Sequence, residues 1–395
     1  MHATIIGGGR IGRGFAASLL ERNQVEKNFF DMNEQVVQQF QEKETYKVHV
    51  LGHPEKDTTI HSFEGYSISA TDALAKELAK TDFVVTAVGG KNLAQLGETI
   101  GKSYKEALKN GEKPGFIILT CENWMTPADD LKSAILQQLT SEEQEIFTEK
   151  VDVTQGVIRA SGTSAPAGEE TSNPLDTWMQ DYWVLPVDRK RITQNSIPDW
   201  DYFDFDDQFG EMLAQKIYTN NTSVALIAYL GYLKGHRYVA DAANDPEIEP
   251  ILKKCYEEIN AALIETLGVS EESQLEFSRI AEEKYKDRTI VDEVTRIGRD
   301  PIRKLAQDDR LIGPAEMALE ADVQPEAIAM GTAAALYFDY PQDPVSVELK
   351  KMREQQGIAY VLETICGLSK ENPLSELIYQ SIDTLKEKQW IKEGV

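Results

Sequence analysis

The sequence has few of the residues that build disulfides and metal sites. Its three cysteines, Cys121, Cys255 and Cys366, are widely spaced and odd in number. That pattern is typical of reduced thiols in a reducing compartment. Four of the five histidines fall within the first 61 residues, and no histidine belongs to a Cys/His cluster. We therefore predict no metal site, and the sequence argues against zinc-dependent chemistry.

Positive charge and long apolar runs are also scarce. The 395 residues include 41 Lys and Arg against 66 Asp and Glu, for a net charge of -25. This balance argues against the concentrated basic face that nucleic acid or an anionic membrane surface requires. No apolar run reaches the length of a transmembrane helix, and the N-terminus enters a strand without the regions of a signal peptide. We expect a cytoplasmic protein with no nucleic-acid or membrane partner.

The N-terminus carries a glycine-rich turn between a strand and a helix. A short apolar strand is followed by Gly7, Gly9 and Gly12, and an apolar-periodic helix covers 15–20. In a dinucleotide-binding βα unit the first glycine permits the turn, the second admits a pyrophosphate, and the third lets the helix pack on the strand. Asp31 ends the next apolar segment, where a carboxylate accepts ribose hydroxyls, which favours NAD over NADP. The alternative is a glycine turn that binds nothing.

Strands and helices continue to alternate, which indicates an α/β domain with a parallel sheet. Ligands bind outside the carboxyl ends of such strands, so Gly89 and the pair Glu122 and Asn123 should border the cofactor crevice. We predict strands over 46–51, 66–69, 83–88, 115–120, 151–159 and 182–186, and helices over 70–79, 93–108, 127–139 and 142–150. The predicted cofactor-binding residues are Gly7, Gly9, Arg10, Ile11, Gly12, Asp31, Val88 and Gly89.

The second half of the chain has helical periodicity. We place the domain boundary near Asp199, inside a Pro-, Asp- and aromatic-rich segment, 197–205, that is typical of a linker. Residues 161–174 predict either a loop beside the cleft or a plain surface excursion. The predicted helices cover 209–233, 250–267, 272–285, 314–319, 325–337, 345–358 and 374–388. We thus expect an N-terminal Rossmann domain over 1–198 and an all-α domain over 199–395.

One helical segment carries candidate catalytic side chains. Hydride transfer without a metal needs a side chain that exchanges the hydroxyl proton and donors that stabilise the oxygen. Lys216 could be such a base if it is partly desolvated, although most helical lysines are solvated. Asn220 and Asn221 are weak helix formers, and beside Thr222 they indicate either polar groups that face a cavity or an N-cap.

Several motifs follow one another along the chain in an order that is typical of a known family. They cover 9–15, 30–33, 46–50, 86–89, 121–123, 228–231, 235–236 and 296–304. In these stretches the chain resembles the mannitol dehydrogenase family of long-chain polyol dehydrogenases, and most of all its mannitol-1-phosphate 5-dehydrogenase branch. The resemblance covers nearly the whole chain and implies an NAD-binding N-terminal domain, a helical C-terminal domain and a metal-independent reaction with a lysine base.

Carried over by motif, the resemblance assigns the general base to Lys216 and its accompanying amide to Asn221. The asparagine of the Cys-Asp/Glu-Asn motif falls on Asn123. His236 matches a shared structural position. These three residues, Lys216, Asn221 and Asn123, are the predicted catalytic set, and the active site is expected in the cleft between the domains.

Two motifs depart from the family pattern. Where the family has Gly-His after the lysine and asparagine, this chain has Ser223 and Val224, and where it has Asp-Arg this chain has Ile158 and Arg159. Loss of hydrogen-bonding groups from a site costs orders of magnitude for the substrate that used them. A different substrate or feeble activity is the expected consequence.

A basic cluster in the C-terminal half suits a phosphorylated substrate. Guanidinium forks match phosphate geometry, whereas the competing interpretation is a helix face paired with the many carboxylates. Lys304 belongs to the same cluster. The predicted substrate-binding residues are Arg159, Arg296, Arg299 and Arg303.

The sequence therefore predicts an NAD-dependent oxidoreductase that interconverts a polyol, in particular a polyol phosphate such as mannitol 1-phosphate, and the ketose, here fructose 6-phosphate. Two alternatives remain. One is a 2-hydroxyacid or sugar-acid reductase, which shares the plan of a Rossmann domain followed by helices. The other is a non-catalytic NAD-binding relative, which the substitutions at Val224 and Ile158 favour.

Overall fold

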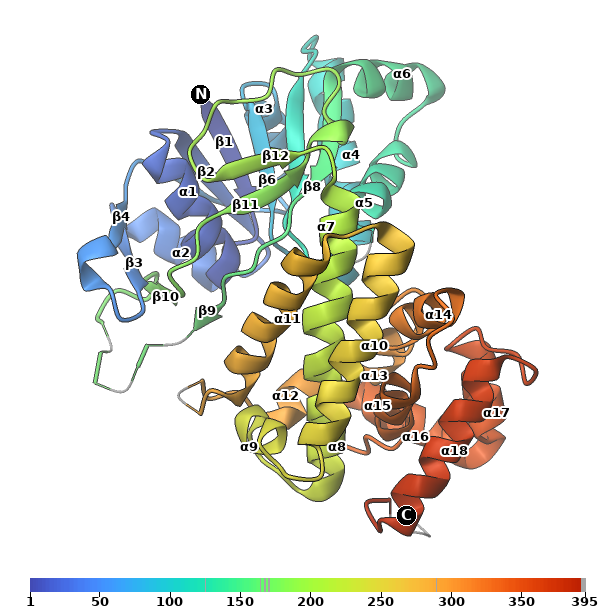
Figure 1. Ribbon diagram of the computed structural model, residues 1–395. Coiled ribbons are helices and arrows are strands. Elements are labelled where there is room, and N and C mark those ends of the chain that lie inside the picture. Colours follow the sequence, from blue (N-terminus) through green and yellow to red (C-terminus); the bar gives the residue numbers. More distant parts are fainter. Residues whose placement is uncertain (125, 164, 167, 170, 289, 392–395) are drawn as a thin grey trace. The chain divides into compact units, whose positions relative to one another are not determined.

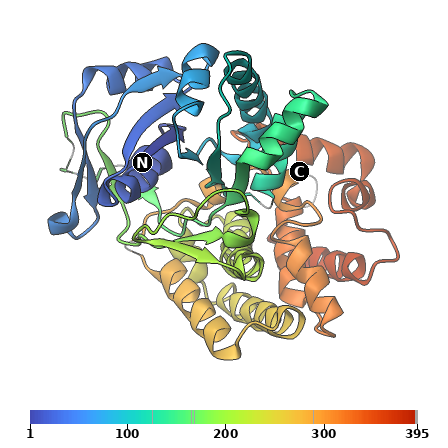
Figure 2. The same ribbon diagram turned by 90° about the horizontal axis from the view of Figure 1, so that it is seen from above.

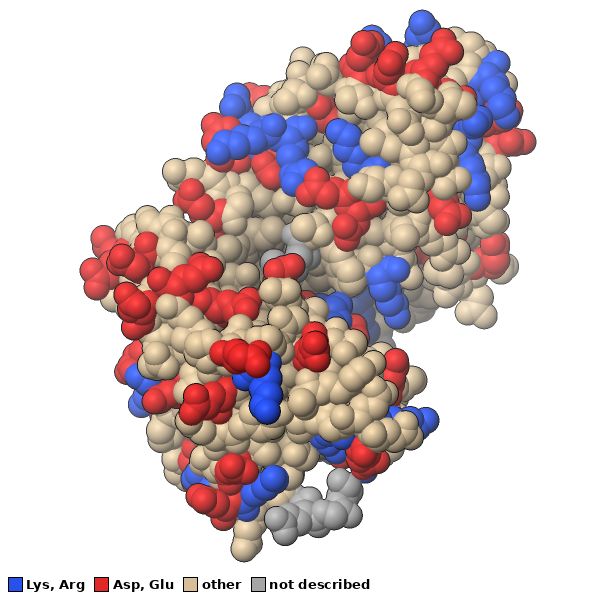
Figure 3. Space-filling view, turned by 90° about the vertical axis from the view of Figure 1, so that its right-hand side faces the viewer, with Lys and Arg blue, Asp and Glu red and all other residues tan. Residues whose placement is uncertain are grey.

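The chain folds into two compact units, Met1–Phe209 and Gly210–Val395. Figure 1 shows the computed structural model, which describes all residues except 125, 164, 167, 170, 289 and 392–395. Each unit has its own buried apolar core. Acidic side chains are spread over the face shown in Figure 3, and the basic side chains on it form no single continuous patch.

A six-stranded, fully parallel sheet forms the centre of the first unit, with strand order β5-β2-β1-β6-β7-β8. The strands are β1 (His2–Ile6), β2 (Glu26–Asp31), β5 (Gly65–Ser67), β6 (Phe83–Thr86), β7 (Phe116–Thr120) and β8 (Val151–Gln155). The strands are apolar over nearly their whole length because both faces of the sheet are buried against other elements. Neighbours in sequence enter opposite cores: Ile5 and Phe29 belong to one apolar cluster, and Ile6 and Phe30 to the other.

Helices supply the cover on the two faces of this sheet, as the alternation of apolar segments predicted (Figure 1). They are α1 (Ala17–Arg22), α2 (Glu34–Glu42), α3 (Thr71–Leu78), α4 (Leu93–Lys109), α5 (Pro127–Leu136) and α6 (Ser141–Lys150). Short helical turns lie at η1 (Arg10–Ala16), η2 (Pro54–Lys56), η3 (Gly90–Asn92) and η4 (Arg189–Arg191). The predicted α/β architecture is confirmed.

Two small sheets complete the first unit. The larger has strand order β4-β3-β10-β9, with β3 (Tyr46–Val50), β4 (Thr58–Ile60), β9 (Gly162–Thr163) and β10 (Thr177–Met179). The smaller pairs β11 (Leu185–Asp188) with β12 (Phe203–Asp206). Residues 203–206 were expected in a linker, but their alternate residues Phe203 and Phe205 pack on the core, and the compact unit continues to Phe209.

The second unit is helical. Its elements are α7 (Phe209–Lys216), η5 (Ile217–Asn221), α8 (Thr222–Lys234), α9 (Val239–Ala243), α10 (Glu249–Leu267), α11 (Glu271–Lys286), α12 (Val294–Gly298), α13 (Pro301–Lys304), α14 (Ile312–Glu320), α15 (Glu326–Leu336), α16 (Pro344–Gln356), α17 (Ile358–Thr364) and α18 (Pro373–Glu387). Helix α8 is apolar on all sides and packs against α9, α10, α12 and α15, which makes it the centre of the unit. Figure 2 shows these helices from above, coloured yellow-green to red. None of the described helices has the length and apolarity needed to cross a membrane.

Candidate functional site

The glycine turn after β1 is built from close backbone contacts. Gly7 has φ +106°, and a Cβ there would lie 2.5 Å from the Ala87 carbonyl oxygen. A Cβ on Gly12 would lie 1.8 Å from the Gly7 carbonyl oxygen, which no side-chain movement relieves. Only glycine fits these two positions, because the first turn of the helix packs directly on the turn that precedes it.

Gly9 has the opposite environment, since a Cβ there would meet nothing within 4 Å. The helical run that follows starts at Arg10 as a π-helix, η1, and continues as α1. No side chain caps its first turn. The first N–H groups of a helical run, here including that of Ile11, have no acceptor within the helix, and such a terminus attracts anions.

Asp31 closes the other side of the turn from the carboxyl end of β2. Its Oδ2 accepts a hydrogen bond from the Gly8 N–H at 2.5 Å, and its Oδ1 accepts one from the Asn33 N–H at 2.7 Å. The carboxylate is therefore fixed in direction and remains partly exposed. It can accept further hydrogen bonds from a ligand.

A cavity of about 280 Å³ lies against this turn. Four of the residues predicted to bind the cofactor line it together: Gly7, Gly9, Asp31 and Val88. The remaining lining residues are Ile6, Phe30, Met32, Ile68, Ala87, Asn92, Gln95, Leu96 and Thr99. The residues at and after the N-cap of α4 were not among those predicted to bind the cofactor, although the spacing of 92, 95, 96 and 99 is typical of one face of a helix.

Buried Glu122 fixes the segment that carries Val88 and Gly89. Its Oε1 accepts hydrogen bonds from the Val88 N–H at 3.1 Å and the Thr86 hydroxyl at 3.0 Å, and its Oε2 accepts one from the Gly89 N–H at 2.7 Å. Burial raises the pKa of Glu122 despite these three donors. Exposed Asn123 follows it in the segment after β7. Glu122 thus joins the segments that follow β6 and β7, but none of Gly89, Glu122 and Asn123 lines the cavity described above, so their place beside the cofactor stays a prediction.

The segment with Lys216 and Asn221 contains a π turn. The Thr222 N–H donates to the Ile217 carbonyl, five residues back. In an α-helix two residues five apart point about 140° away from each other. A turn closed by a five-residue hydrogen bond instead brings them to one side. The π turn therefore places Lys216 and Asn221 on a shared face, and it excludes the N-cap interpretation because the helical run passes through it.

Solvent reaches only one stripe of this segment. Lys216, Asn220 and Val224 are half-buried, whereas Ile217–Thr219 and Asn221–Ser223 are buried. The Ser223 hydroxyl donates back to the Thr219 carbonyl at 2.7 Å and lies close to the Asn220 carbonyl. Of the two departures from the family motif here, only Val224 changes the accessible surface.

The predicted phosphate-binding arginines differ in their partners. Arg296 forms a bidentate ion pair with Asp292. Arg303 donates hydrogen bonds to the carboxylates of Asp300 and Asp309. Arg299 is exposed and has no ion-pair partner among the residues that the structure describes. Arg159 belongs to the first unit, where its Nη1 donates to the Tyr182 hydroxyl at 3.3 Å.

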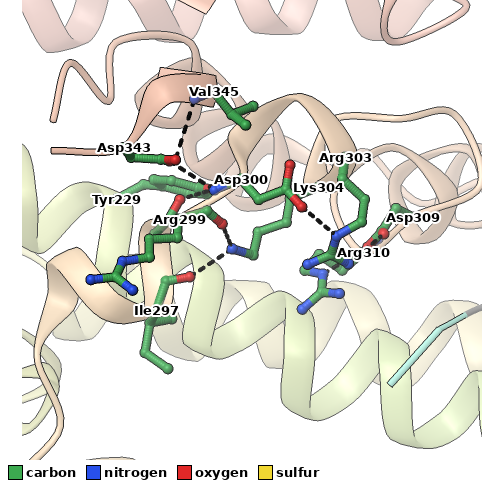
Figure 4. Close-up of polar contacts among 11 residues, drawn as sticks. Tyr229, Ile297, Arg299, Asp300, Arg303, Lys304, Asp309, Arg310, Asp343 and Val345 are labelled. Carbon is green, nitrogen blue, oxygen red and sulfur yellow. Dashed lines mark hydrogen bonds and ion pairs between the residues drawn. The ribbon is translucent and has the colours of Figure 1, made fainter. Parts of the chain in front are cut away.

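The segment that carries Arg299 is held by three buried side chains (Figure 4). The Lys304 ammonium donates to the carbonyls of Ile297 and Arg299, the Tyr229 hydroxyl donates to the Gly298 carbonyl at 3.0 Å, and the Asp343 carboxylate accepts from the Asp300 N–H at 2.8 Å. Asp300 adopts a left-handed backbone conformation, φ +60°. Burial and then the charges of Arg310 and Arg303 lower the pKa of Lys304 to about 7.

His236 is part of an ion-pair network. Its Nε2 lies 2.8 Å from Asp245 Oδ2, and Asp245 also accepts from the Lys234 ammonium at 2.6 Å. Although burial opposes it, these partners hold the pKa of Asp245 well below its usual range. This arrangement agrees with the structural role expected for His236. No group of three metal-ligating side chains occurs in the part of the chain that the structure describes.

Fold and glycine turn together define a Rossmann dinucleotide-binding domain followed by a helical domain. Residues 1–199 match the mannitol dehydrogenase Rossmann domain, and residues 208–386 match the mannitol dehydrogenase C-terminal domain. The chain belongs to the mannitol dehydrogenase family, and it is an oxidoreductase of that family.

Individual relatives agree with this assignment. The chain is 30% identical over 390 residues to mannitol-1-phosphate 5-dehydrogenase of Caldanaerobacter subterraneus subsp. tengcongensis, covering 98% of this chain and 99% of the relative. It is 31% identical over 382 residues to the Bacillus pumilus enzyme of the same name, covering 96% and 98%. The structure of Pseudomonas fluorescens mannitol 2-dehydrogenase with NAD and D-mannitol matches with a TM-score of 0.81 at 13% identity, covering 99% of this chain and 92% of that one.

Proposed function

We propose that the protein is an NAD-dependent dehydrogenase that interconverts a polyol phosphate, such as mannitol 1-phosphate, and a ketose phosphate, such as fructose 6-phosphate. The proposal is supported by the π turn, whose geometry turns half-buried Lys216 and buried Asn221 toward one side of the segment. The names of the relatives that are 30% and 31% identical support the substrate class.

The cavity at the glycine turn suits the adenosine and pyrophosphate part of a dinucleotide. A pyrophosphate needs close approach to the backbone and N–H donors. The turn and the helix start that follows it provide both, through Gly7, Gly9, Arg10, Ile11 and Gly12. Val88 lines the cavity, and the N–H groups of Val88 and Gly89 are held by hydrogen bonds to buried Glu122. When bound, NAD supplies the hydride acceptor, and NADH the hydride donor.

Asp31 explains the preference for NAD over NADP. Its oriented carboxylate can accept both hydroxyls of an adenosine ribose. The 2′-phosphate of NADP would instead lie beside the Asp31 carboxylate. The two groups are both anionic, so they would repel each other, and neither could donate a hydrogen bond to the other. Met32, Ile68 and Leu96 give the neighbouring apolar surface on which an adenine ring can pack.

Lys216 serves as the general base in this proposal. Its neutral amine Nζ accepts the proton of the substrate hydroxyl while the carbon that bears this hydroxyl gives up its hydride to the nicotinamide. In the direction of ketose reduction the ammonium returns the proton to the oxygen. The amide N–H groups of Asn221 and Asn123 donate to the oxygen and stabilise its developing negative charge. Val224 offers no hydrogen bond at the position where the family has a histidine.

Arg299 is the arginine best suited to the phosphate. Arg296 and Arg303 are already paired with carboxylates, so a phosphate would have to compete for them. Arg299 keeps its full charge and its donors, and the segment that carries it is fixed by Lys304, Tyr229 and Asp343 (Figure 4). A guanidinium that is held in place binds phosphate with less loss of conformational entropy.

The test is an NADH oxidation assay with a panel of carbonyl substrates, after NADH binding has been measured by fluorescence. The panel contains fructose 6-phosphate, free fructose and 2-keto acids. Turnover that is fastest with fructose 6-phosphate supports the proposal. Turnover with 2-keto acids alone would replace it with a hydroxyacid reductase, and tight NADH binding without any turnover would indicate the non-catalytic relative.

A further inference from the structure

A buried cluster of uncharged polar side chains lies directly behind the π turn. Its centre is Gln274 of α11, whose side chain is fully buried. The Gln274 Nε2 lies 2.9 Å from the Thr219 Oγ1, 2.8 Å from the Asn260 Oδ1 and 3.3 Å from the Ser278 Oγ, and its Oε1 accepts from the Gln215 amide at 3.0 Å. These residues come from four elements: α7, η5, α10 and α11.

An amide in an apolar helical core is costly unless its hydrogen bonds are made. Gln274 meets this requirement, because its two N–H groups have Thr219 and Asn260 within reach and its carbonyl has Gln215. Simple packing would be served equally well by a leucine or methionine. A satisfied polar network instead specifies one arrangement of the elements that contribute to it.

The partners of Gln274 bracket the proposed base. Gln215 immediately precedes Lys216, and Thr219 lies within the π turn, three residues after it. One side chain on α11 therefore holds the chain on both sides of Lys216. Neither Gln215 nor Thr219 is accessible to solvent, so these contacts lie behind the accessible stripe and leave it open.

Hydroxyl groups make further hydrogen bonds in the same turn and next to it. The Tyr285 hydroxyl donates to the Asn220 carbonyl at 3.1 Å, and the Ser223 hydroxyl donates to the Thr219 carbonyl at 2.7 Å. The Thr222 hydroxyl donates to the Arg310 carbonyl at 2.6 Å. A π turn disrupts the regular α-helical ladder, so side-chain donors of this kind stabilise it.

We propose that Gln274 is a positioning residue, which holds the π turn and thereby keeps Lys216 and Asn221 on one face for proton transfer. This inference rests on the proposed function. It assigns Gln274 no contact with substrate or cofactor. It also gives Ser223 a supporting role in place of the glycine of the family motif.

The test replaces Gln274 with methionine, which has a similar length and no hydrogen-bonding amide. The expected result is a fall in kcat of about 10- to 100-fold, because small displacements of a catalytic group cost this much. The NADH dissociation constant should stay unchanged, and the pH at which kcat is half-maximal should move. Thr332→Val is the matched control: it removes one buried hydroxyl, which donates to the Ile328 carbonyl of its own helix α15.

A purely structural role gives a different result. In that case Gln274→Met and Thr332→Val would lower the melting temperature alike and leave kcat and its pH profile unchanged, which would overturn the inference. Should Gln274→Met not fold, Thr219→Val serves instead, because it removes the hydroxyl through which the Gln274 amide contacts the π turn. The same loss of kcat is then expected, and a normal kcat would contradict the proposal.

The outcome can be separated from that of the proposed function. If Lys216→Ala retains turnover, the function assigned to the site is wrong. If Lys216→Ala is inactive while Gln274→Met has a normal kcat and pH profile, only the positioning role is wrong.

Discussion

The two units each contain a π turn at the residues assigned to function, but they hold it by different means. In the first unit η1 follows the glycine turn, and the backbone packs so closely that Gly7 and Gly12 admit no side chain. In the second unit η5 is held by side chains, above all Gln274 and Ser223. Steric fit thus shapes the proposed cofactor site, and a polar network shapes the proposed catalytic site.

The first test breaks the glycine turn and has the largest expected effect. Gly12→Ala places a Cβ against the Gly7 carbonyl oxygen, so we expect a destabilisation at or above the top of the range of about 1–3 kcal/mol for overpacking, together with loss of NADH binding. Thermal unfolding and fluorescence titration measure the two effects.

Gly9→Ala is the matched control for that substitution. Its Cβ has open space, so the melting temperature should stay at the wild-type value while NADH binds more weakly, because the methyl group occupies the approach of the pyrophosphate. An NADH affinity equal to that of wild type in Gly9→Ala would contradict the placement of the cofactor.

The second test uses a buried carboxylate that accepts backbone N–H groups, a feature that both units contain. In the second unit Glu258 accepts from Ala327 and Ile328 at the start of α15, and burial raises its pKa to about 7 from 4.5. Between these pH values the folded state binds more protons than the unfolded state, so stability falls as pH rises from 4.5 to 7. The loss should be on the order of 3 kcal/mol.

Glu258→Gln should remove this pH dependence, as measured by urea unfolding at pH 5 and pH 7.5. Glu348→Gln, at an exposed position of α16, controls for loss of a carboxylate and should keep the wild-type slope. A free energy of unfolding of the wild-type protein that stays constant or rises from pH 5 to pH 7.5, with the same pH dependence in Glu258→Gln, would contradict the raised pKa of Glu258.

The third test sharpens the contrast in how the two units would bind phosphate. The first would use backbone N–H groups at a helix start, and the second a guanidinium on a fixed segment. Arg299→Gln should raise KM for fructose 6-phosphate by about 10- to 100-fold, the value of a charge-assisted hydrogen bond, without changing the KM for free fructose. Steady-state kinetics with both sugars measures it.

Arg296→Gln is the control for Arg299→Gln, because Arg296 is already paired with Asp292. Its effect on KM for the phosphorylated sugar should be the smaller of the two. Equal effects of both substitutions, or a larger effect at Arg296, would show that the ion pairs do not decide which arginine binds the phosphate.

The same contrast explains what the sequence could predict. The glycine turn, Asp31 and the apolar strands are local signals, so the Rossmann fold and the glycine-turn side of its cavity were predictable, whereas the α4 side of the cavity was not. The helix predicted over 209–233 was right as a helical run, but nothing in its residues marked the π turn at 217–221. Residues 203–206 were assigned to a linker because their pairing with β11 depends on a distant strand.

The supporting network was beyond sequence reasoning for a physical reason. Gln274, Asn260 and Ser278 are polar residues on helices that were predicted correctly, and polar helical residues are usually exposed. Their burial depends on how α10 and α11 pack against the π turn. Likewise, the arginine cluster was predicted as a group, and only the positions of Asp292, Asp300 and Asp309 distinguish Arg299 from its neighbours.

The central claim is that Lys216 on the π turn is the base of a dehydrogenase. The most direct measurement is turnover of fructose 6-phosphate with NADH by Lys216→Ala, alongside an NADH titration of the same variant. We predict that NADH binds as it does to wild type and that turnover falls by at least about 100-fold, the lower range for loss of a general base. Full turnover in Lys216→Ala would contradict the account.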